Sequence, residues 1–566
     1  MSTNQQWDQF YSSGDEPAPE KKRGIPKAAW GIGLGCLLLL VIGLVVGILG
    51  YQWFFGARDP IAAKVPADTA VYMSLDLKKA QSDELQNIIR VFSQMGGVED
   101  VKTTAELIDE ALGDLSMSFE DDIQPWIGLH AALVSMDPEM GAGVVIIETR
   151  SQAGADKFIS DLTAALEDTQ GTTFDEQRAG NITMFVSDDP YNAMTIARSG
   201  GLLYIASDED ALLDIVDAGR SDVLANTKAY KNTMAALRGD RLVTIFVSGE
   251  AYGEMAGPYS DSGLGGAYGL VAEGVLGMGI AASADDAGLR FDAAIAYDES
   301  ALDAYQKRVV QATYKDPTTA RLVPDDTFLF LGVNGSTTAN SFLDSENPAA
   351  DDIRESLELF EDETGLNAIE VLDALGGEFG FALGPANDGM LAEQSGTNMG
   401  MSMFIGTTDD DVVRSWLDDA MDVLGEQTGT EMQRSDLGIG RYDLQEVRIE
   451  SPYESGTAFL YGVQDGLLII GSSEDMLTRA LEDNQSLAND SAYRDTWKAF
   501  SPGSHPLLYV DMAGFMDFLE STGELDYTDD AVVRGLRDIP TIAATINNAP
   551  AFTQSFSLIV FVEGGN

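Results

Sequence analysis

Short apolar runs of strand length follow one another along most of the chain. They are rich in β-branched and aromatic residues and alternate with polar turns, the pattern of partly or fully buried β-strands. In the first half the predicted strands include TAVYMSLDL (69–77), GVVIIETR (143–150), NITMFVSD (181–188), LLYIAS (202–207), RLVTIFVS (241–248) and LRFDAAIAY (289–297).

Helical patterns lie between some of these strands. The stretch 153–168, AGADKFISDLTAALED, places Phe158, Ile159, Leu162 and Leu166 at helical spacing. Elsewhere one strand pattern follows another directly, which favours antiparallel hairpins over a doubly wound parallel sheet. The predicted fold class is therefore α+β with a mixed, largely antiparallel arrangement.

Several segments occur twice in the same order. VPADTAVYMSLDL from Val65 matches VPDDTFLFLGVNG from Val323, and GLLYIASDEDAL from Gly201 matches GLLIIGSSEDML from Gly466 with eight identities in twelve. An ordered set of matches at a nearly constant offset indicates internal duplication. We expect two tandem α+β domains, 60–315 and 320–566.

The junction between these copies is predicted in YQKRVVQATYKDPTTARL, with a helix that ends before Pro317. Both members of the second matched pair also contain a helix start, SDED from Ser207 and SSED from Ser472. A serine N-cap followed by acidic residues is expected at both, so these acids are interpreted as caps.

Ahead of the repeats lies an uncharged stretch from Ala28 to Ala57, with Trp30 and Trp53 near its ends. About 20 apolar residues cross a bilayer, and tryptophans favour its two interfaces. We predict a single transmembrane helix at 28–55. A cleaved signal peptide is the alternative, but its apolar region is shorter and precedes a small-residue cleavage site.

The flanking charges predict the orientation of this helix. Four basic residues precede it, Lys21, Lys22, Arg23 and Lys27. The positive-inside rule then places a disordered tail, 1–27, in the cytoplasm and the rest of the chain outside.

The chain is strongly acidic, with 34 Lys+Arg against 92 Asp+Glu and a formal charge of −58. The first 57 residues are electrically balanced, so the whole excess lies in the predicted ectodomain. Such a surface excludes nucleic acid as a partner, because phosphate binding needs cationic groups. Solubility explains the acidity, and adaptation to salt or divalent cations is the alternative.

This acidity predicts that NaCl or millimolar Ca²⁺ raises the melting temperature of the ectodomain. Equal effects at matched ionic strength indicate screening, whereas a larger effect of Ca²⁺ indicates specific sites. A melting temperature indifferent to both contradicts the electrostatic argument.

Candidate chemistry is sparse. The one cysteine, Cys36, lies in the apolar stretch, and the two histidines, His130 and His505, lie in strand-like surroundings where packing is the expected role. Disulfides, thiolate zinc sites and His-rich metal sites within the chain are excluded. No Gly-x-Ser-x-Gly elbow occurs, so no catalytic residues and no cofactor are predicted.

Paired acids are frequent, and one triplet is the candidate for Ca²⁺: Asp409, Asp410 and Asp411. Calcium takes several carboxylate oxygens at flexible spacing. No run matches an EF-hand loop, and helix caps or solvated turns explain such acids equally simply. Any Ca²⁺ bound here is expected to be adventitious.

An apolar helix just ahead of a VPADTAVYMSLD-type strand, followed by a tandem α+β ectodomain, resembles the bacterial family called domain of unknown function 3352. The resemblance covers about residues 60 to 566. It implies a bacterial envelope location, and it implies no activity and no functional residues.

The sequence thus predicts a single-pass protein of the bacterial plasma membrane whose bulk is extracytoplasmic. The expected function is a non-enzymatic binding or scaffolding module of the cell envelope, with an envelope protein or polymer as partner. The alternative is an extracytoplasmic hydrolase that uses acidic residues, for example on glycans.

Overall fold

A computed structural model of the 566-residue chain forms the basis of the following description. It describes residues 60–77, 117–138, 141–180, 182–189, 193–216, 222–256, 274–335, 348–390, 398–428, 431–450, 455–482, 485–522, 530–548 and 552–562, together with Asp109, Leu115, Leu343 and Ala392. The predicted tail and membrane segment, 1–27 and 28–55, lie outside these residues.

Among the described residues, the first half contains ten strands and a set of helices. Its elements are β1 (Val71–Asp76), η3 (Phe119–Ile123), β2 (Ile127–Ser135), β3 (Gly143–Thr149), α4 (Gln152–Gln170), β4 (Phe174–Ala179), β5 (Ile182–Ser187), β6 (Thr195–Ser199), β7 (Leu202–Ala206), α5 (Glu209–Val216), η4 (Leu224–Asn226), α6 (Lys228–Ala236), β8 (Val243–Ser248), α7 (Gly249–Ala256), β9 (Val275–Asp285) and β10 (Gly288–Tyr297).

The connection and the second half follow. Their elements are α9 (Ala304–Val310), β11 (Tyr314–Lys315), η6 (Thr318–Arg321), β12 (Leu329–Gly335), α11 (Pro348–Thr364), α12 (Ala368–Ala374), β13 (Leu375–Pro385), β14 (Met399–Thr407), α14 (Asp410–Thr428), β15 (Glu431–Ile439), β16 (Tyr442–Glu450), β17 (Ser455–Gln464), β18 (Leu467–Gly471), α15 (Glu474–Leu481), η7 (Leu487–Asn489), α16 (Ser491–Thr496), η8 (Trp497–Ala499), β19 (Ser504–Asp511), α17 (Met512–Thr522), α18 (Asp530–Arg537), β20 (Thr541–Asn547) and β21 (Thr553–Phe561).

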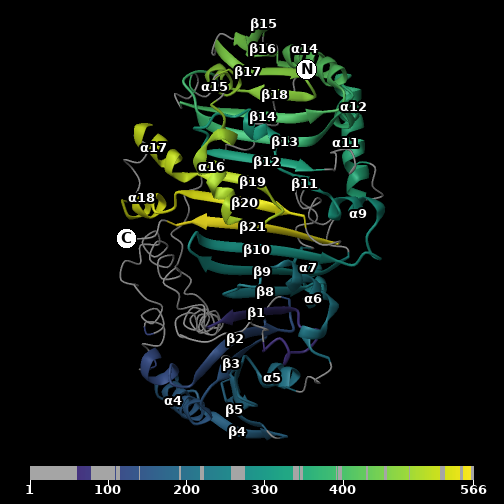
Figure 1. Ribbon diagram of the computed structural model, residues 1–566. Helices are drawn as coiled ribbons and strands as arrows, with labels where there is room; N and C mark the ends of the chain where they lie inside the picture. The colour runs from purple at the N-terminus through teal and green to yellow at the C-terminus, as the bar shows by residue number, and fades with distance from the viewer. Residues whose placement is uncertain are drawn as a thin grey trace, which may run out of the picture.

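All of these strands belong to one 21-stranded sheet, and every pairing between them is antiparallel. The sheet runs from β4 at one end through β5, β6, β7, β3, β2, β1, β8, β9 and β10 to β21, then through β20, β19, β12, β13, β14, β18, β17 and β16 to β15 (Figure 1). The prediction of a mixed α+β fold with a largely antiparallel sheet is confirmed.

The order of pairings is the same in both halves. β1 pairs with β2 and β8, and β12 pairs with β13 and β19 in the same way. The segments from Val65 and Val323 therefore enter the sheet at equivalent places. Each is also fixed by the same contact, because the carbonyl oxygen of Val65 accepts from Leu224 N at 3.0 Å and that of Val323 from Leu487 N at 2.9 Å.

Helices cover both faces of the sheet in each half. In β3, Val145 and Ile147 pack toward α4, whereas Val144 and Ile146 pack in the core that contains residues of α5 and α6. In the second half, α12 and α14 border one core and α15 and α16 another. Because both faces are buried, strands such as GVVIIET are apolar at nearly every position.

The two halves meet where β10 pairs with β21, which we call the seam. Asp292 of β10 lies opposite Ser557 of β21, and the Ser557 hydroxyl donates to Asp292 Oδ1 at 2.5 Å. These residues are 265 apart, the offset that separates Gly201 from Gly466. The pairing is thus centred on corresponding residues of the two halves, and it makes the sheet continuous between them.

In the connection between the halves, the helix α9 ends at Val310, before Pro317 as predicted, and the short strand β11 follows it. β11 pairs with β12, so Tyr314 lies opposite Gly335. A two-residue strand gives no periodic signal, which is why the sequence did not reveal it.

One predicted helix cap is also corrected. In α15 the side chain of Ser473 accepts from Met476 N, as predicted, but in α5 Asp208 takes this role and accepts from Ala211 N. Ser207 instead accepts from Gly143 N at 3.2 Å, on the neighbouring strand. An aspartate caps a helix as well as a serine does, so the two are not distinguished by sequence alone.

Within the described residues, no helix has both the length and the apolar character needed to cross a membrane.

Both ends of the sheet carry charged residues. β4 pairs with β5 alone among the described strands, and its four central residues, Asp175, Glu176, Gln177 and Arg178, are exposed. β15 is the corresponding strand at the other end. Charged edge strands discourage pairing with another molecule.

We therefore expect Asp175→Val with Glu176→Val to cause self-association of the full chain, seen as a higher mass by light scattering. Glu167→Val with Asp168→Val is the matched control, because both residues are exposed on α4 and the charge change is the same. Equal self-association of the two double variants would mean that the loss of charge, and not the exposed strand edge, causes it.

Candidate functional site

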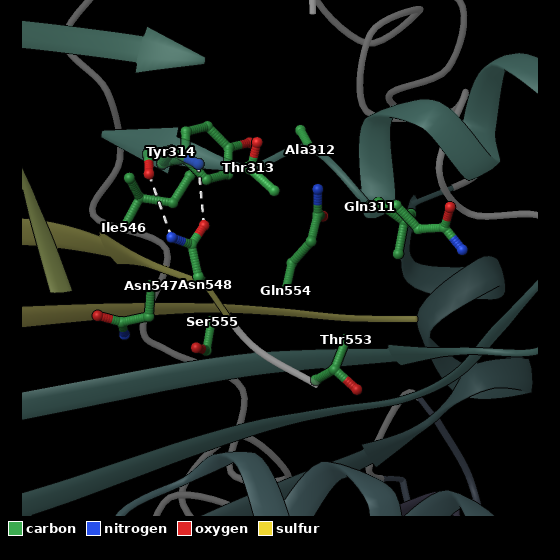
Figure 2. Close-up of a pocket in the computed structure, with 11 residues that line it drawn as sticks. Gln311, Ala312, Thr313, Tyr314, Ile546, Asn547, Asn548, Thr553, Gln554 and Ser555 are labelled. Carbon is green, nitrogen blue, oxygen red and sulfur yellow. Dashed lines mark hydrogen bonds between the residues drawn. The ribbon is translucent and has the colours of Figure 1, made fainter. Parts of the chain in front are cut away.

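A cavity of about 230 Å³ lies beside the seam, where the connection passes over the ends of β20 and β21. Three of its lining residues are apolar: Val310, Ala312 and Ile546. The other eight are Asn, Gln, Ser, Thr or Tyr, and none is charged (Figure 2). An uncharged lining is unusual here, because charged residues make up 22% of the chain.

Local sequence holds the connection in place above the sheet. Asp303 caps α9 through a reciprocal capping box with Gln306. The helix ends at Val310 and is capped by Gln311, whose N–H donates to Lys307 O at 3.0 Å, and the chain then extends into β11. The segment 311–314 thus forms one wall of the cavity, and the last two strands form the other.

Asn548 connects these two walls by hydrogen bonds. Its Oδ1 accepts from Tyr314 N at 2.9 Å, and its Nδ2 donates to Tyr314 O at 3.1 Å (Figure 2). These two hydrogen bonds resemble the paired backbone bonds between neighbouring strands. They also identify which amide atom of Asn548 is the oxygen and which is the nitrogen. Both contacts are lost if the side chain is shortened.

The same amide determines the tautomer of His505. Nδ2 of Asn548 lies 2.9 Å from His505 Nε2, and His505 Nδ1 lies 2.9 Å from Asp316 Oδ1. Since Nδ2 only donates, Nε2 must accept, and the imidazole proton then lies on Nδ1 and points to Asp316. Both ring nitrogens of His505 thus make hydrogen bonds, and the side chain belongs to the network that connects the two walls.

We accordingly expect the neutral imidazole of His505 to carry its proton on Nδ1. Two-dimensional ¹⁵N–¹H spectra of histidine-labelled full chain test this, since only two histidines contribute. His130→Gln assigns the remaining signals to His505. Signals of the Nε2–H tautomer would show that the arrangement of Asn548 is wrong.

Gln554 extends into the cavity from β21. Its Oε1 accepts from the Tyr297 hydroxyl at 2.9 Å, and its Nε2 lies at 3.5 Å from Val309 O. Figure 2 shows its amide nitrogen directed toward Ala312, between the two walls. Burial raises the pKa of the Tyr297 and Tyr314 phenols, so both stay protonated and uncharged.

The predicted Ca²⁺ candidates lie far along the chain from this cavity, at the start of α14. Asp409 Oδ1 accepts from Asp411 N at 3.1 Å and Val412 N at 3.2 Å, which is a helix cap. Asp410 accepts from Thr407 and from Gly466 N, and Asp411 pairs with Arg414 at 2.7 Å. Each carboxylate is thus engaged by different protein groups.

Across the described ranges, no group of three or more His, Cys, Asp or Glu side chains is placed to hold a metal ion.

The other histidine, His130, lies on β2. Its Nδ1 is 2.9 Å from Oε2 of Glu148 on β3, and the same oxygen accepts from Leu129 N at 3.0 Å. The hydrogen bond with His130 lowers the pKa of Glu148. This pair bridges two neighbouring strands.

Sequence reasoning missed Gln554 and Asn548 altogether. Both are neutral residues of common type near strand ends, and Tyr314 precedes Asn548 by 234 residues. Only the three-dimensional pairing brings them together, so no local signal identified them.

A family model described as "Protein of unknown function (DUF3352)" matches residues 32–555. The chain belongs to the DUF3352 family. The match includes the whole cavity lining and most of both halves, with β21 of the seam included as far as Ser555. It confirms the resemblance found in the sequence.

Comparison with solved structures gives weak likenesses. Crystal form III of TP0453 is similar at 9% identity and a TM-score of 0.25, over 46% of this chain and 90% of that one. Crystal form I gives 9% identity and a TM-score of 0.24, over 46% and 88%. No curated protein matches the DUF3352 chain significantly.

Proposed function

We propose that this DUF3352 protein is a single-pass, membrane-anchored, extracytoplasmic protein of the bacterial cell envelope, and that it acts as a non-enzymatic binding module. Its ectodomain consists of two copies of one α+β unit, about 60–315 and 320–566, joined at the seam. The partner is a polymer or protein of the envelope.

The observation that carries the binding proposal is the uncharged lining of the seam cavity. A glycan hydrolase of the usual kind needs two carboxyl groups on opposite sides of the scissile bond. No carboxyl or imidazole group belongs to the lining. Asn, Gln, Tyr and hydroxyl groups orient a ligand by hydrogen bonds, and the lining holds no carboxylate, imidazole or amine that would activate a hydroxyl as a nucleophile.

Two further observations support duplication. The strands pair in the same order in both halves, and an aromatic group recurs at corresponding places. Tyr72, Tyr230 and Phe246 contact one another in the first half at ring distances of 6.1 and 5.4 Å. Their counterparts are the cluster of Phe330, Tyr493 and Tyr509, with ring distances of 6.3 and 5.1 Å.

The membrane part of the proposal rests on the uncharged stretch from Ala28 and on the basic residues before it. Protease added to spheroplasts tests the topology. We expect digestion of a C-terminal tag and protection of an N-terminal tag. A protected C-terminal tag contradicts the proposed orientation.

A second assay separates binding from hydrolysis. Full chain incubated with purified cell-wall polymer is expected to co-sediment with it and to generate no new reducing ends. Release of reducing ends would favour the hydrolase, provided that heat-denatured protein releases none.

A further inference from the structure

We propose that the seam cavity binds one uncharged, hydroxyl-bearing ring, namely a single neutral sugar unit. This inference deepens the proposed binding function and rests on it. It names the ligand class and assigns Gln554 as the residue that recognises it.

Charge is the first argument. An anionic ligand needs a cationic partner, and a cationic ligand needs a carboxylate, but the lining holds neither. Asp316 and His505 pair with each other at 2.9 Å, and the other ring nitrogen of His505 contacts Asn548. An overall charge of −58 further disfavours polyanionic polymers.

Hydrogen-bonding capacity is the second argument. Tyr297 holds the oxygen of Gln554, so the amide must present its Nε2 donors to the cavity. The contact with Val309 O, at 3.5 Å, is long and engages only one of the two hydrogens. A ligand oxygen, as in a hydroxyl group, is the complementary acceptor.

Size and shape are the third argument. A volume of about 230 Å³ is smaller than the pockets of roughly 300 to 1,000 Å³ that enclose drug-sized ligands. The apolar residues Ala312 and Ile546 and the half-buried ring of Tyr314 supply non-polar surface beside the amides. A sugar ring combines an apolar C–H face with a rim of hydroxyl groups, and such a mixed lining matches both.

Gln554 has no polar counterpart in the first half, although the strand pattern repeats. With the offset of 265 residues, the counterpart of Gln554 in β10 is Leu289, which has no hydrogen-bonding side chain. The connection that forms the second wall lies between the halves, after β10 and before β12. The duplicated units therefore provide the frame, and the seam provides the binding site.

The test measures ligand binding by saturation-transfer NMR and calorimetry on the full chain, in a detergent without a sugar headgroup. The probes are glucose and N-acetylglucosamine, with glucuronate as the charged analogue of glucose and N-acetylglycinamide as an uncharged peptide analogue. We expect saturable binding of at least one neutral sugar, with glucuronate at least about tenfold weaker.

Two variants locate the binding. Gln554→Leu is expected to weaken sugar binding at least about tenfold, and Ala312→Trp is expected to abolish it by filling the cavity. Gln177→Leu, on the exposed strand β4, is the control with the same change of side chain and should bind as the wild type does. Unchanged melting curves establish that each variant is folded.

Several outcomes would overturn the proposal. These are the absence of saturable binding of either neutral sugar, equal binding of glucuronate, binding of N-acetylglycinamide alone, or full sugar binding by folded Ala312→Trp. None of them affects the protease result on topology, so failure of this inference is distinguishable from failure of the proposed location.

Discussion

Arg290→Ala is expected to lower the free energy of unfolding of the full chain by about 3–5 kcal/mol. Arg290 lies on β10 in the first half and is only 1% exposed. Its guanidinium donates to Ala499 O at 2.5 Å and lies 5.3 Å from the centre of the Phe500 ring, both in the second half. Truncation leaves a cavity and removes the donor from a buried carbonyl.

Chemical denaturation of the full chain measures this loss. Arg178→Ala removes the same charge from a side chain that is 77% exposed, and it should cost less than about 1 kcal/mol. Arg290→Met keeps most of the aliphatic volume, so its loss of unfolding free energy is expected to lie between those of Arg290→Ala and Arg178→Ala. A loss for Arg290→Ala no larger than that of Arg178→Ala would show that this residue does not join the halves.

Tyr72→Ala and Phe330→Ala are each expected to lower the free energy of unfolding by about 3–5 kcal/mol. The two losses should agree within about 1 kcal/mol. Tyr72 is 0% exposed and Phe330 is 1% exposed, and each packs edge-on against a helix tyrosine, Tyr230 or Tyr493. Equivalent positions in two copies of one unit lose equivalent contacts.

Equilibrium denaturation again provides the measurement. Leu129→Ala is the control, since Leu129 lies on β2 with 45% of its surface exposed and should lose less than about 1 kcal/mol. The double variant Tyr72→Ala with Phe330→Ala should be additive, because the two sites share no contact. A small cost at one site and a large cost at the other would contradict the equivalence of the two aromatic clusters.

Much of the fold was predictable because its signals are local. Runs such as GVVIIET and LLYIA are apolar at nearly every position since both faces of the sheet are covered, and this signal survives in a single sequence. α4 was predicted from the spacing of Phe158, Ile159, Leu162 and Leu166.

The exposed strand β4 (FDEQRA) was missed because a charged edge strand lacks the apolar alternation that marks a strand.

The seam and the cavity were not predictable from the sequence. β10 and β21 are ordinary apolar strands, and nothing in either indicates that Ala293 lies opposite Phe556. The candidate chemistry was sought among acids and histidines, which have distinctive reactivity. Gln554 and Asn548 have none, and their roles depend on Tyr297 and Tyr314, more than 230 residues earlier.

The continuous sheet and the cavity depend on one register between β10 and β21. A cysteine pair tests it, in a Cys36→Ser chain that has no other thiol. Directly opposite residues of antiparallel strands have Cα atoms about 4.5–5.5 Å apart, within the range of a disulfide. Ala293 and Phe556 are such a pair, whereas Val560 lies four residues further along β21, about 13 Å away.

We therefore expect mild oxidation of the full chain to link Ala293→Cys with Phe556→Cys, and not Ala293→Cys with Val560→Cys, with mass spectrometry of the linked peptides as the readout. A link in the second pair, or in neither, would contradict the seam and the cavity built upon it.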